Sequence, residues 1–379
     1  MNKKIVFLTG TRADYGKLKS LMKRVETHEK FTLYIFATGM HLLSKYGLTY
    51  QEIVKDGFNN IYSFINQQNN SQMDIALSNT ILGFSNYISE VKPDLIVVHG
   101  DRLEALAGAI VGAFNNIKVA HIEGGEVSGT IDESIRHAIT KFAHIHFVAN
   151  EEAKKRVLQL GEVENSIHVI GSPDIDIMNS TSLPKIETVK ERYTIPYENY
   201  SILIYHPVTT QLFSLQNKVK NVVKAILHSE KNYIVIYPNN DEGSSTILEE
   251  FNKFKNKKNI KLFPSLRFEY FLTLLKHSDL IIGNSSTGIR EASIYGIPSI
   301  DIGNRQEGRY NVENSNNITH VEENVTEITE AIDSLTNSRF EPLYLHGNGD
   351  SEDKFIQSIE NDGIWNMEYQ KKFIDIGNL

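Results

Sequence analysis

Residues 94–102 read Asp-Leu-Ile-Val-Val-His-Gly-Asp-Arg, and residues 118–125 read Lys-Val-Ala-His-Ile-Glu-Gly-Gly. Each stretch is a short apolar run that ends in an acid, Asp101 in the first and Glu123 in the second. Runs that are apolar throughout are typical of parallel strands covered on both faces. A third acid, Asp132, stands where the segment 131–137 is expected to open a helix.

These three acids are predicted to share one cleft. In open parallel sheets the ligand crevice lies beyond the carboxyl ends of the strands, which is where Asp101 and Glu123 are expected. Crowded carboxylates titrate apart, so that one can donate a proton while another accepts one.

The same pattern of apolar runs and helical periods extends outward in both directions. It predicts strands at 5–8, 32–36, 146–148 and 167–170, and again at 202–205, 234–237, 260–263, 280–282 and 299–302. Alternation of this kind indicates an α/β fold with two doubly wound Rossmann-like domains. The expected organisation is a first domain over 1–172, a linker over 173–200, a second domain over 201–353, and a C-terminal helix over 354–379 that packs back across the domains.

Composition narrows the class of protein. The 379 residues carry a net charge of -8 without a basic stripe, which argues against a nucleic-acid partner. There are no cysteines, which excludes disulfides, thiolate metal sites and cysteine nucleophiles. The apolar run at 5–8 is too short for a signal peptide and no window approaches a membrane span, so we expect a cytoplasmic protein with no membrane partner.

The first strand is followed by Thr-Gly-Thr-Arg-Ala-Asp-Tyr-Gly-Lys at 9–17. Backbone N–H groups at a helix start, together with Arg12 and Lys17, suit a phosphate. The spacing matches neither a dinucleotide fingerprint nor a Walker A loop, and a plain strand-to-helix turn is the alternative interpretation.

In the second half, residues 279–288 read Asp-Leu-Ile-Ile-Gly-Asn-Ser-Ser-Thr-Gly, a strand that leads directly into a helix. Ser285 and Ser286 with nearby N–H groups would meet a diphosphate, and Glu291 one turn later would accept bonds from a ribose diol. Helix capping is the alternative. Three more residues are expected at strand ends of this domain: His206, Asn239 and Arg305.

A metal site is the rival interpretation of the first-half motif. His99, Asp101, His121 and Glu123 could form one, but no HExxH or EF-hand spacing is present. We therefore expect no metal and no cofactor.

Taken together, these motifs resemble the hydrolysing UDP-N-acetylglucosamine 2-epimerases, from about residue 5 to 310. The resemblance rests on Gly-Thr-Arg-Ala-Asp-Tyr at 10–15, His-Gly-Asp-Arg at 99–102, His-Ile-Glu-Gly-Gly-Glu at 121–126, the helix start at 131–140, His-Pro-Val-Thr-Thr at 206–210 and Gly-Asn-Ser-Ser at 283–286. It implies a GT-B type fold, with the two domains facing a central cleft, and a homodimer. It also implies a UDP-sugar substrate and a UDP product.

By this resemblance, four residues fall on the family's catalytic positions: Asp101, Glu123, Asp132 and His206. The nucleotide-binding positions fall on Arg12, Arg102, Ser285, Ser286, Glu291 and Arg305, with Asn239 and Lys17 as further candidates. The implied reaction eliminates UDP to give 2-acetamidoglucal, which is then hydrated to N-acetylmannosamine for sialic acid biosynthesis.

Four alternatives stay open at this point. The same chemistry could act on UDP-2,4-diacetamido-2,4,6-trideoxyglucose for legionaminic acid. A non-hydrolysing epimerase usually has Pro-Glu after Gly-Thr-Arg, where this chain has Ala13 and Asp14. The others are a GT-B glycosyltransferase with a separate acceptor and a sugar-binding module without catalysis.

Overall fold

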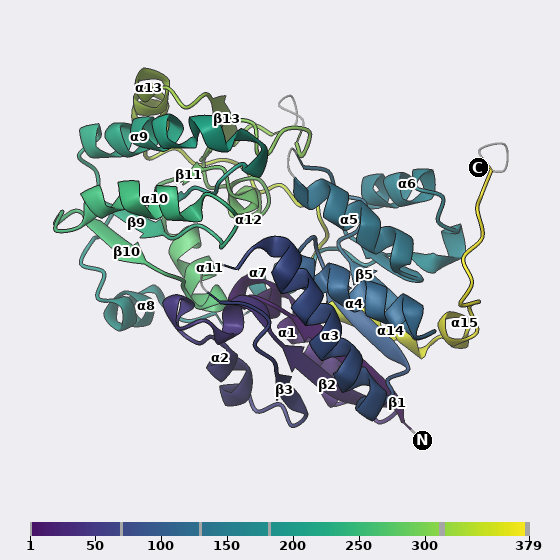
Figure 1. The fold of residues 1–379 in the computed structure, drawn as a ribbon. Helices are drawn as coiled ribbons and strands as arrows, with labels where there is room; N and C mark the ends of the chain where they lie inside the picture. Colours follow the sequence, from purple (N-terminus) through teal and green to yellow (C-terminus); the bar gives the residue numbers. More distant parts are fainter. Residues whose placement is uncertain (1, 69–70, 129–130, 181–182, 311–314, 376–379) are drawn as a thin grey trace. The chain divides into compact units, whose positions relative to one another are not determined.

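The computed structural model describes residues 2–68, 71–128, 131–180, 183–310 and 315–375. The chain folds as two compact units, each built on its own sheet (Figure 1). The first unit comprises Met1–Glu126, Asp132–Asn179 and Leu345–Leu379, and the second comprises Val127–Ile131 and Ser180–Tyr344.

The sheet of the first unit has seven parallel strands within the described residues. They are β1 (Lys3–Thr9), β2 (Phe31–Ala37), β3 (Ile61–Ser63), β4 (Leu95–His99), β5 (Lys118–Ile122), β6 (Ile145–Val148) and β7 (Ile167–Val169). Their order across the sheet is β3-β2-β1-β4-β5-β6-β7.

Helices cover both faces of this sheet, because alternate side chains of β1 point to opposite sides. Ile5 and Phe7 pack with α1 (Arg12–Glu26) and α14 (Ser351–Glu360), whereas Val6 and Leu8 pack with α3 (Met73–Val91) and α4 (Leu103–Phe114). The helices and 3₁₀ turns of this unit are α1 (Arg12–Glu26), η1 (Gly39–Leu42), η2 (Ser44–Tyr46), α2 (Tyr50–Lys55), α3 (Met73–Val91), α4 (Leu103–Phe114), α5 (Ile131–Phe142), α6 (Glu151–Gln159), η3 (Glu164–Ser166), α7 (Pro173–Met178), α14 (Ser351–Glu360) and α15 (Asp362–Trp365).

The second unit repeats this plan with six parallel strands in its described part. They are β8 (Ser201–Ile204), β9 (Tyr233–Ile236), β10 (Ile260–Phe263), β11 (Ile281–Gly283), β12 (Ser299–Ile302) and β13 (Ile318–Val321), in the order β10-β9-β8-β11-β12-β13. Its helices and turns are α8 (Ile186–Tyr193), η4 (Thr209–Gln211), α9 (Leu212–His228), α10 (Ser244–Phe251), η5 (Asn252–Phe254), α11 (Phe268–Lys276), η6 (Ser286–Gly288), α12 (Glu291–Ile294) and α13 (Val325–Leu335).

Both strand orders are doubly wound, which confirms the predicted fold class. In each sheet the winding reverses at one point, between β1 and β4 in the first and between β8 and β11 in the second. Ligands of such sheets bind at this switch point. Two edge strands, β3 and β13, were not predicted, because short, half-exposed strands lack a continuous apolar run.

The segment 173–200, expected as a linker, contains two helices in its described part. Helix α7 belongs to the first unit and α8 to the second. The chain end returns to the first unit, where the Phe355 ring lies 4.9 Å from that of Phe147 and 6.2 Å from that of Phe7, measured between ring centroids.

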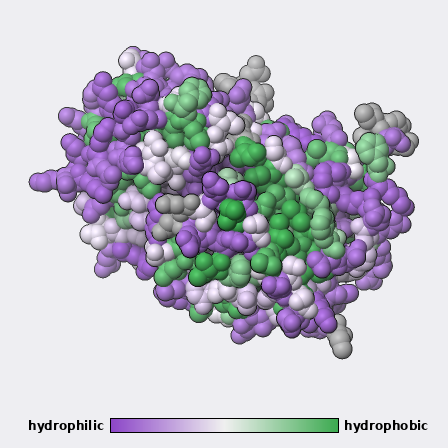
Figure 2. Space-filling view, viewed as in Figure 1, coloured by the Kyte–Doolittle hydropathy of each residue, from purple (hydrophilic) through white to green (hydrophobic). Residues whose placement is uncertain are grey.

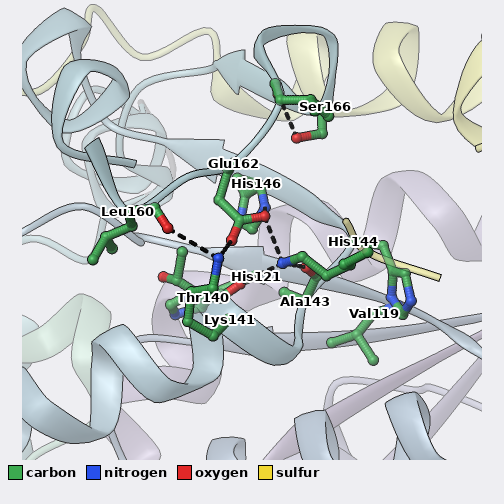
Figure 3. A network of polar contacts seen from close by, with 12 residues as sticks. Val119, His121, Thr140, Lys141, Ala143, His144, His146, Leu160, Glu162 and Ser166 are labelled. Atoms are coloured by element: carbon green, nitrogen blue, oxygen red, sulfur yellow. Dashed lines mark hydrogen bonds and ion pairs between the residues drawn. The ribbon is translucent and has the colours of Figure 1, made fainter. Parts of the chain in front are cut away.

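A polar network surrounds Glu162, which lies near Lys141 and His146 (Figure 3). Glu162 Oε1 is 2.7 Å from Lys141 Nζ, and Glu162 Oε2 is 3.1 Å from His146 Nε2 and 2.5 Å from Lys371 Nζ. Burial alone would raise the pKa of Glu162, but the contacts with His146 and the two lysines outweigh burial, so the pKa lies below its usual value. The network holds the tail against β6 and α5.

No helix among the described residues combines the length and the apolar composition needed to cross a bilayer.

Candidate active site

The loop after β1 is organised by Asp14. Thr11 caps helix α1 by accepting a hydrogen bond from the Asp14 N–H at 3.1 Å. The Asp14 carboxylate accepts in turn from the Gly10 N–H at 2.9 Å and from the Thr9 hydroxyl. Burial raises the pKa of Asp14, although these bonds oppose it. The Gly10 N–H is therefore used within the turn. Arg12, a predicted anion ligand in the same segment, has its Nη2 2.7 Å from Glu52 Oε1.

Glu123 lies at the centre of a charged cluster at the end of β5. Its Oε2 is 3.3 Å from His99 Nε2 and its Oε1 is 4.0 Å from Lys17 Nζ. The Ser172 hydroxyl also donates to Oε1, and Lys17 Nζ lies 3.0 Å from Asp174 Oδ2. Only 1% of the Asp174 side chain is exposed, so this cluster is shielded from water.

The backbone of Glu123 is unusual, because its φ is +64°. Non-glycine residues in this left-handed region carry strain and concentrate at functional sites. Gly125, two residues later, also has a left-handed backbone, and a Cβ there would lie 2.3 Å from the Ala153 backbone oxygen. The Glu-Gly-Gly sequence is thus required to turn the chain and direct Glu123.

Asp101 and Asp132 are linked through helix α5. Asp132 stands in the first turn of α5, and Arg136, one turn later, donates to the Asp101 carboxylate. Arg136 Nη1 also donates to the Glu126 carbonyl at 3.2 Å. Helix α5 therefore brings Asp132, and the Arg136 that pairs with Asp101, to the same end of the sheet.

A buried histidine supports this end of β4. His121 Nε2 bonds the Gly100 carbonyl at 2.8 Å, and Gly100 joins His99 to Asp101 in a left-handed turn. Burial lowers the pKa of His121 to about 3, so the ring is neutral and acts as a fixed donor.

The second unit places its predicted residues around Asn284, which follows β11. The Asn284 side chain accepts from the His206 N–H at 2.7 Å and donates to the His206 carbonyl at 2.9 Å. Its own carbonyl accepts from Arg305 Nη1 at 3.2 Å and Gln306 Nε2 at 2.8 Å. The ends of β8 and β11 are therefore joined by one asparagine.

The ring of His206 is oriented by Asn239, whose N–H donates to Nδ1 at 3.1 Å. A neutral ring with this bond carries its proton on Nε2. Ser285 caps the turn η6, accepting from the Thr287 N–H at 3.4 Å, so the capping interpretation describes one of its contacts. Ser286 begins η6, and Glu291, which is buried, begins α12.

The first unit thus collects Lys17, Asp101, Glu123 and Asp132 at the carboxyl ends of its strands, and the second collects His206, Asn239, Ser285 and Arg305 at the equivalent ends. Sequence reasoning missed five supporting residues: Arg136, Ser172, Asp174, Asn284 and Gln306. Asn284 could have been found, because it stands within the quoted strand-to-helix motif.

The arrangement does not favour the metal interpretation. No group of three or more histidine, aspartate, glutamate or cysteine side chains in the described part of the chain is placed to hold a metal ion. Of the four residues considered, His121 is directed to Gly100 and Thr140 instead.

Comparisons with known proteins give a consistent result. A family model described as UDP-N-acetylglucosamine 2-epimerase matches residues 23–360. A UDP-N-acetylglucosamine 2-epimerase of Neisseria meningitidis serogroup B is 47% identical over 99% of this chain and 99% of its own. A UDP-N,N'-diacetylbacillosamine 2-epimerase (hydrolyzing) of Legionella pneumophila is 34% identical over 95% of this chain and 96% of its own.

Among solved structures, the UDP-GlcNAc 2-epimerase of Methanocaldococcus jannaschii in complex with UDP-GlcNAc and UDP matches with a TM-score of 0.81. Its sequence is 25% identical, and the match covers 94% of this chain and 99% of that one.

Proposed function

Because the chain belongs to the UDP-N-acetylglucosamine 2-epimerase family, we propose that it is a hydrolysing UDP-N-acetylglucosamine 2-epimerase. It releases UDP from the substrate, forms 2-acetamidoglucal and hydrates this intermediate to N-acetylmannosamine for sialic acid biosynthesis.

The observation that carries this proposal is the placement of predicted residues at the two switch points. Arg12 begins the helix after β1, Asp101 and Arg102 lie in the loop after β4, and the loops after β8 and β11 carry His206 and Ser285. Switch points are where doubly wound sheets bind ligands. An acid-rich site and a site suited to anions, one in each unit, are what elimination of a nucleoside diphosphate requires.

The first step breaks the C1–O bond and removes the proton from C2. That proton is not acidic, so it leaves only after C1 has gained oxocarbenium character. Arg12, Arg102, Arg305 and backbone N–H groups near Ser285 and Ser286 stabilise the departing diphosphate. A carboxylate takes the C2 proton, and 2-acetamidoglucal and UDP result.

The second step adds water across the double bond. One acid protonates C2 from the opposite face while another directs water to C1, which gives free N-acetylmannosamine. We assign Asp101 and Asp132 to the elimination, Glu123 to the hydration and His206 to the diphosphate. Glu291 bonds the ribose, and Asn239 orients His206.

Two features support hydrolysis rather than re-addition of UDP. Relatives from Legionella pneumophila and Campylobacter jejuni, each 34% identical, carry "hydrolyzing" in their names. The chain also has Ala13-Asp14 after Gly-Thr-Arg, and Asp14 closes the β1 turn through Gly10 and Thr9.

Proton NMR of the purified protein with UDP-N-acetylglucosamine in D₂O tests the proposal. We expect UDP and free N-acetylmannosamine carrying deuterium at C2. Accumulation of UDP-N-acetylmannosamine would indicate the non-hydrolysing reaction, and an unchanged sugar nucleotide would refute both.

Synthetic 2-acetamidoglucal separates the two half-reactions. Asp101→Asn and Asp132→Asn should lose activity on the UDP-sugar and keep hydration of the glucal. Glu123→Gln should lose hydration, and normal hydration by this variant would overturn its assignment.

A second substrate is favoured by the relatives named as diacetylbacillosamine 2-epimerases. The same site would process UDP-2,4-diacetamido-2,4,6-trideoxyglucose, because the two sugars differ at C4 and C6 and not at the reacting carbons. Comparing kcat/KM for UDP release from both substrates identifies the preferred one.

We also propose that the enzyme is cytoplasmic and acts as a homodimer, with a second copy covering helices α3 and α4. Figure 2 shows hydrophobic residues gathered over these helices, and Leu82 is 63% and Phe114 76% exposed. The one charged residue of α4, Glu104, is buried. Helix α3 is about 28 Å long by its 1.5 Å rise per residue, and a stable interface buries roughly 800 Å² per partner. Light scattering of Leu82→Glu tests it: the variant should be monomeric, and an unchanged mass contradicts this interface.

A further inference from the structure

Glu104 is a buried acid that the proposed mechanism does not use. It is the second residue of α4, directly after the loop that carries Asp101 and Arg102, and 1% of its side chain is exposed. Its Oε2 accepts a hydrogen bond from Arg102 Nε at 3.2 Å. Its Oε1 is buried and has no hydrogen-bond partner in the part of the chain that the structure describes.

Two glycines make room for this carboxylate. A Cβ on Gly10 would lie 2.9 Å from Glu104 Cδ, and one on Gly39 would lie 2.6 Å from Glu104 Oε1. Gly10 follows β1 and Gly39 follows β2, so Glu104 packs under both loops at the carboxyl edge of the sheet. Three strand-end loops therefore meet at one side chain.

A buried carboxylate oxygen without a donor destabilises a fold, and Asp14, another buried acid, lies close enough to interact with Glu104 electrostatically. A neutral side chain of the same shape would remove the repulsion from Asp14. The acid therefore has to be explained by its contact with Arg102.

We propose that Glu104 is a positioning residue that fixes the guanidinium of Arg102 for the diphosphate of the nucleotide sugar. A bond through Nε orients the guanidinium plane and leaves the two terminal nitrogens out of that contact, which is the end that binds phosphate oxygens in pairs. This inference rests on the proposed function, because it takes a nucleoside diphosphate as the ligand of Arg102.

The pairing has a parallel in the same unit. Arg12, the other predicted anion ligand of the first unit, is held by Glu52. Glu104 is the more deeply buried of the two acids, with 1% against 16% of the side chain exposed. A deeply buried partner holds an arginine in one orientation more strictly than a solvated one.

The test is Glu104→Gln in the full chain, with three measurements. The urea midpoint should change little, because glutamine keeps the shape of the side chain and an oxygen that can accept from Arg102 Nε, while the repulsion from Asp14 is removed. KM for the UDP-sugar and the inhibition constant of UDP should rise about tenfold, which corresponds to about 1.4 kcal/mol. Inhibition by uridine, which lacks phosphates, should not change.

A double-mutant cycle separates positioning from a direct role. If Glu104 acts through Arg102, Glu104→Gln should add nothing to Arg102→Met. Additive losses of UDP affinity would overturn the proposal, as would a Glu104→Gln variant with wild-type affinity for UDP. If Glu104→Gln does not fold, Glu104→Asp keeps the charge but shortens the reach, and the same loss of UDP affinity is expected of it.

Asp176→Asn provides the matched control. Asp176 is a partly buried acid of the same unit, on α7, that accepts bonds from Ser351 at the start of α14. Its substitution should lower the urea midpoint and leave the inhibition constant of UDP unchanged. Wild-type protein that neither turns over a UDP-sugar nor binds UDP in calorimetry would refute the proposed function itself, and this outcome is distinct from failure of the Glu104 variant.

Discussion

Replacing Lys17 with methionine tests whether the charge cluster around Glu123 is a structural unit. Lys17 Nζ lies 3.0 Å from Asp174 Oδ2 and 4.0 Å from Glu123 Oε1, and all three side chains are largely buried. At an effective dielectric constant of 20, the Coulomb energy of the shorter pair is about 5 kcal/mol. Removing one partner of a buried pair costs about 3–5 kcal/mol, so we expect a loss of this size in unfolding free energy for Lys17→Met.

Urea unfolding at pH 7.5 measures this loss, and a cycle with Asp174→Asn measures the coupling. We expect a coupling energy near 3 kcal/mol, at the upper end for contacting residues. The matched control is Lys354→Met, because Lys354 Nζ lies 2.9 Å from Asp350 Oδ1 on the surface of α14. An exposed pair four residues apart on a helix contributes about 0.3–0.5 kcal/mol. If Lys17→Met costs no more than this control, the reasoning from burial is wrong.

Three further perturbations test other parts of the fold. Burial lowers the pKa of His41 and His121 to about 3 and that of His144 to about 4, so their neutral forms stabilise the fold above pH 6.5. This stability is lost as the pH falls from 6.5 towards 4, by about 1 kcal/mol per histidine per pH unit, and equal urea midpoints at pH 7.5 and 5 would contradict it. Gly283→Ala places a Cβ 1.8 Å from a backbone oxygen of β8 at a residue with φ +130°. It should lower the unfolding free energy measured in urea by about 3 kcal/mol or more, and calorimetry should show that UDP binding is lost. Phe355→Ala should cost about 3–5 kcal/mol, and a smaller loss in thermal unfolding would show that the C-terminal helix packs loosely.

The sheet and the strand-end acids could be predicted from the sequence because both depend on which residues follow one another along the chain. An apolar run followed by an acid places that acid at the carboxyl end of a strand, and the run before Glu123 is β5. The apolar stretch 103–114 that follows Asp101 and Arg102 in the sequence forms helix α4. The chemistry-bearing positions were therefore accessible without knowledge of distant contacts.

The supporting residues could not be predicted because they reach the site through tertiary folding. Ser172 and Asp174 lie about 50 residues after Glu123, on either side of the boundary between the predicted first domain and the predicted linker. Nothing in that segment indicates that a serine and an aspartate return to β5. Arg136 was visible beside Asp132, but its bond to Asp101 depends on the angle at which α5 meets the sheet.

The two strand-end sites are supported by different physics, and this difference bears on the proposed division of labour. In the first unit, acids are held by positive or protonatable partners: Glu123 by Lys17 and His99, and Asp101 by Arg136. Such partners fix the position of a carboxylate, as proton transfer at a defined carbon requires. In the second unit, the Asn284 side chain pairs with the backbone N–H and carbonyl of His206, and the Asn284 carbonyl accepts from Arg305 Nη1. Hydrogen bonds to a neutral asparagine therefore order the turns after β8 and β11, where ion pairs order the strand ends of the first unit. The proposed division of labour, with acid–base chemistry in the first unit and anion binding in the second, agrees with this difference in support.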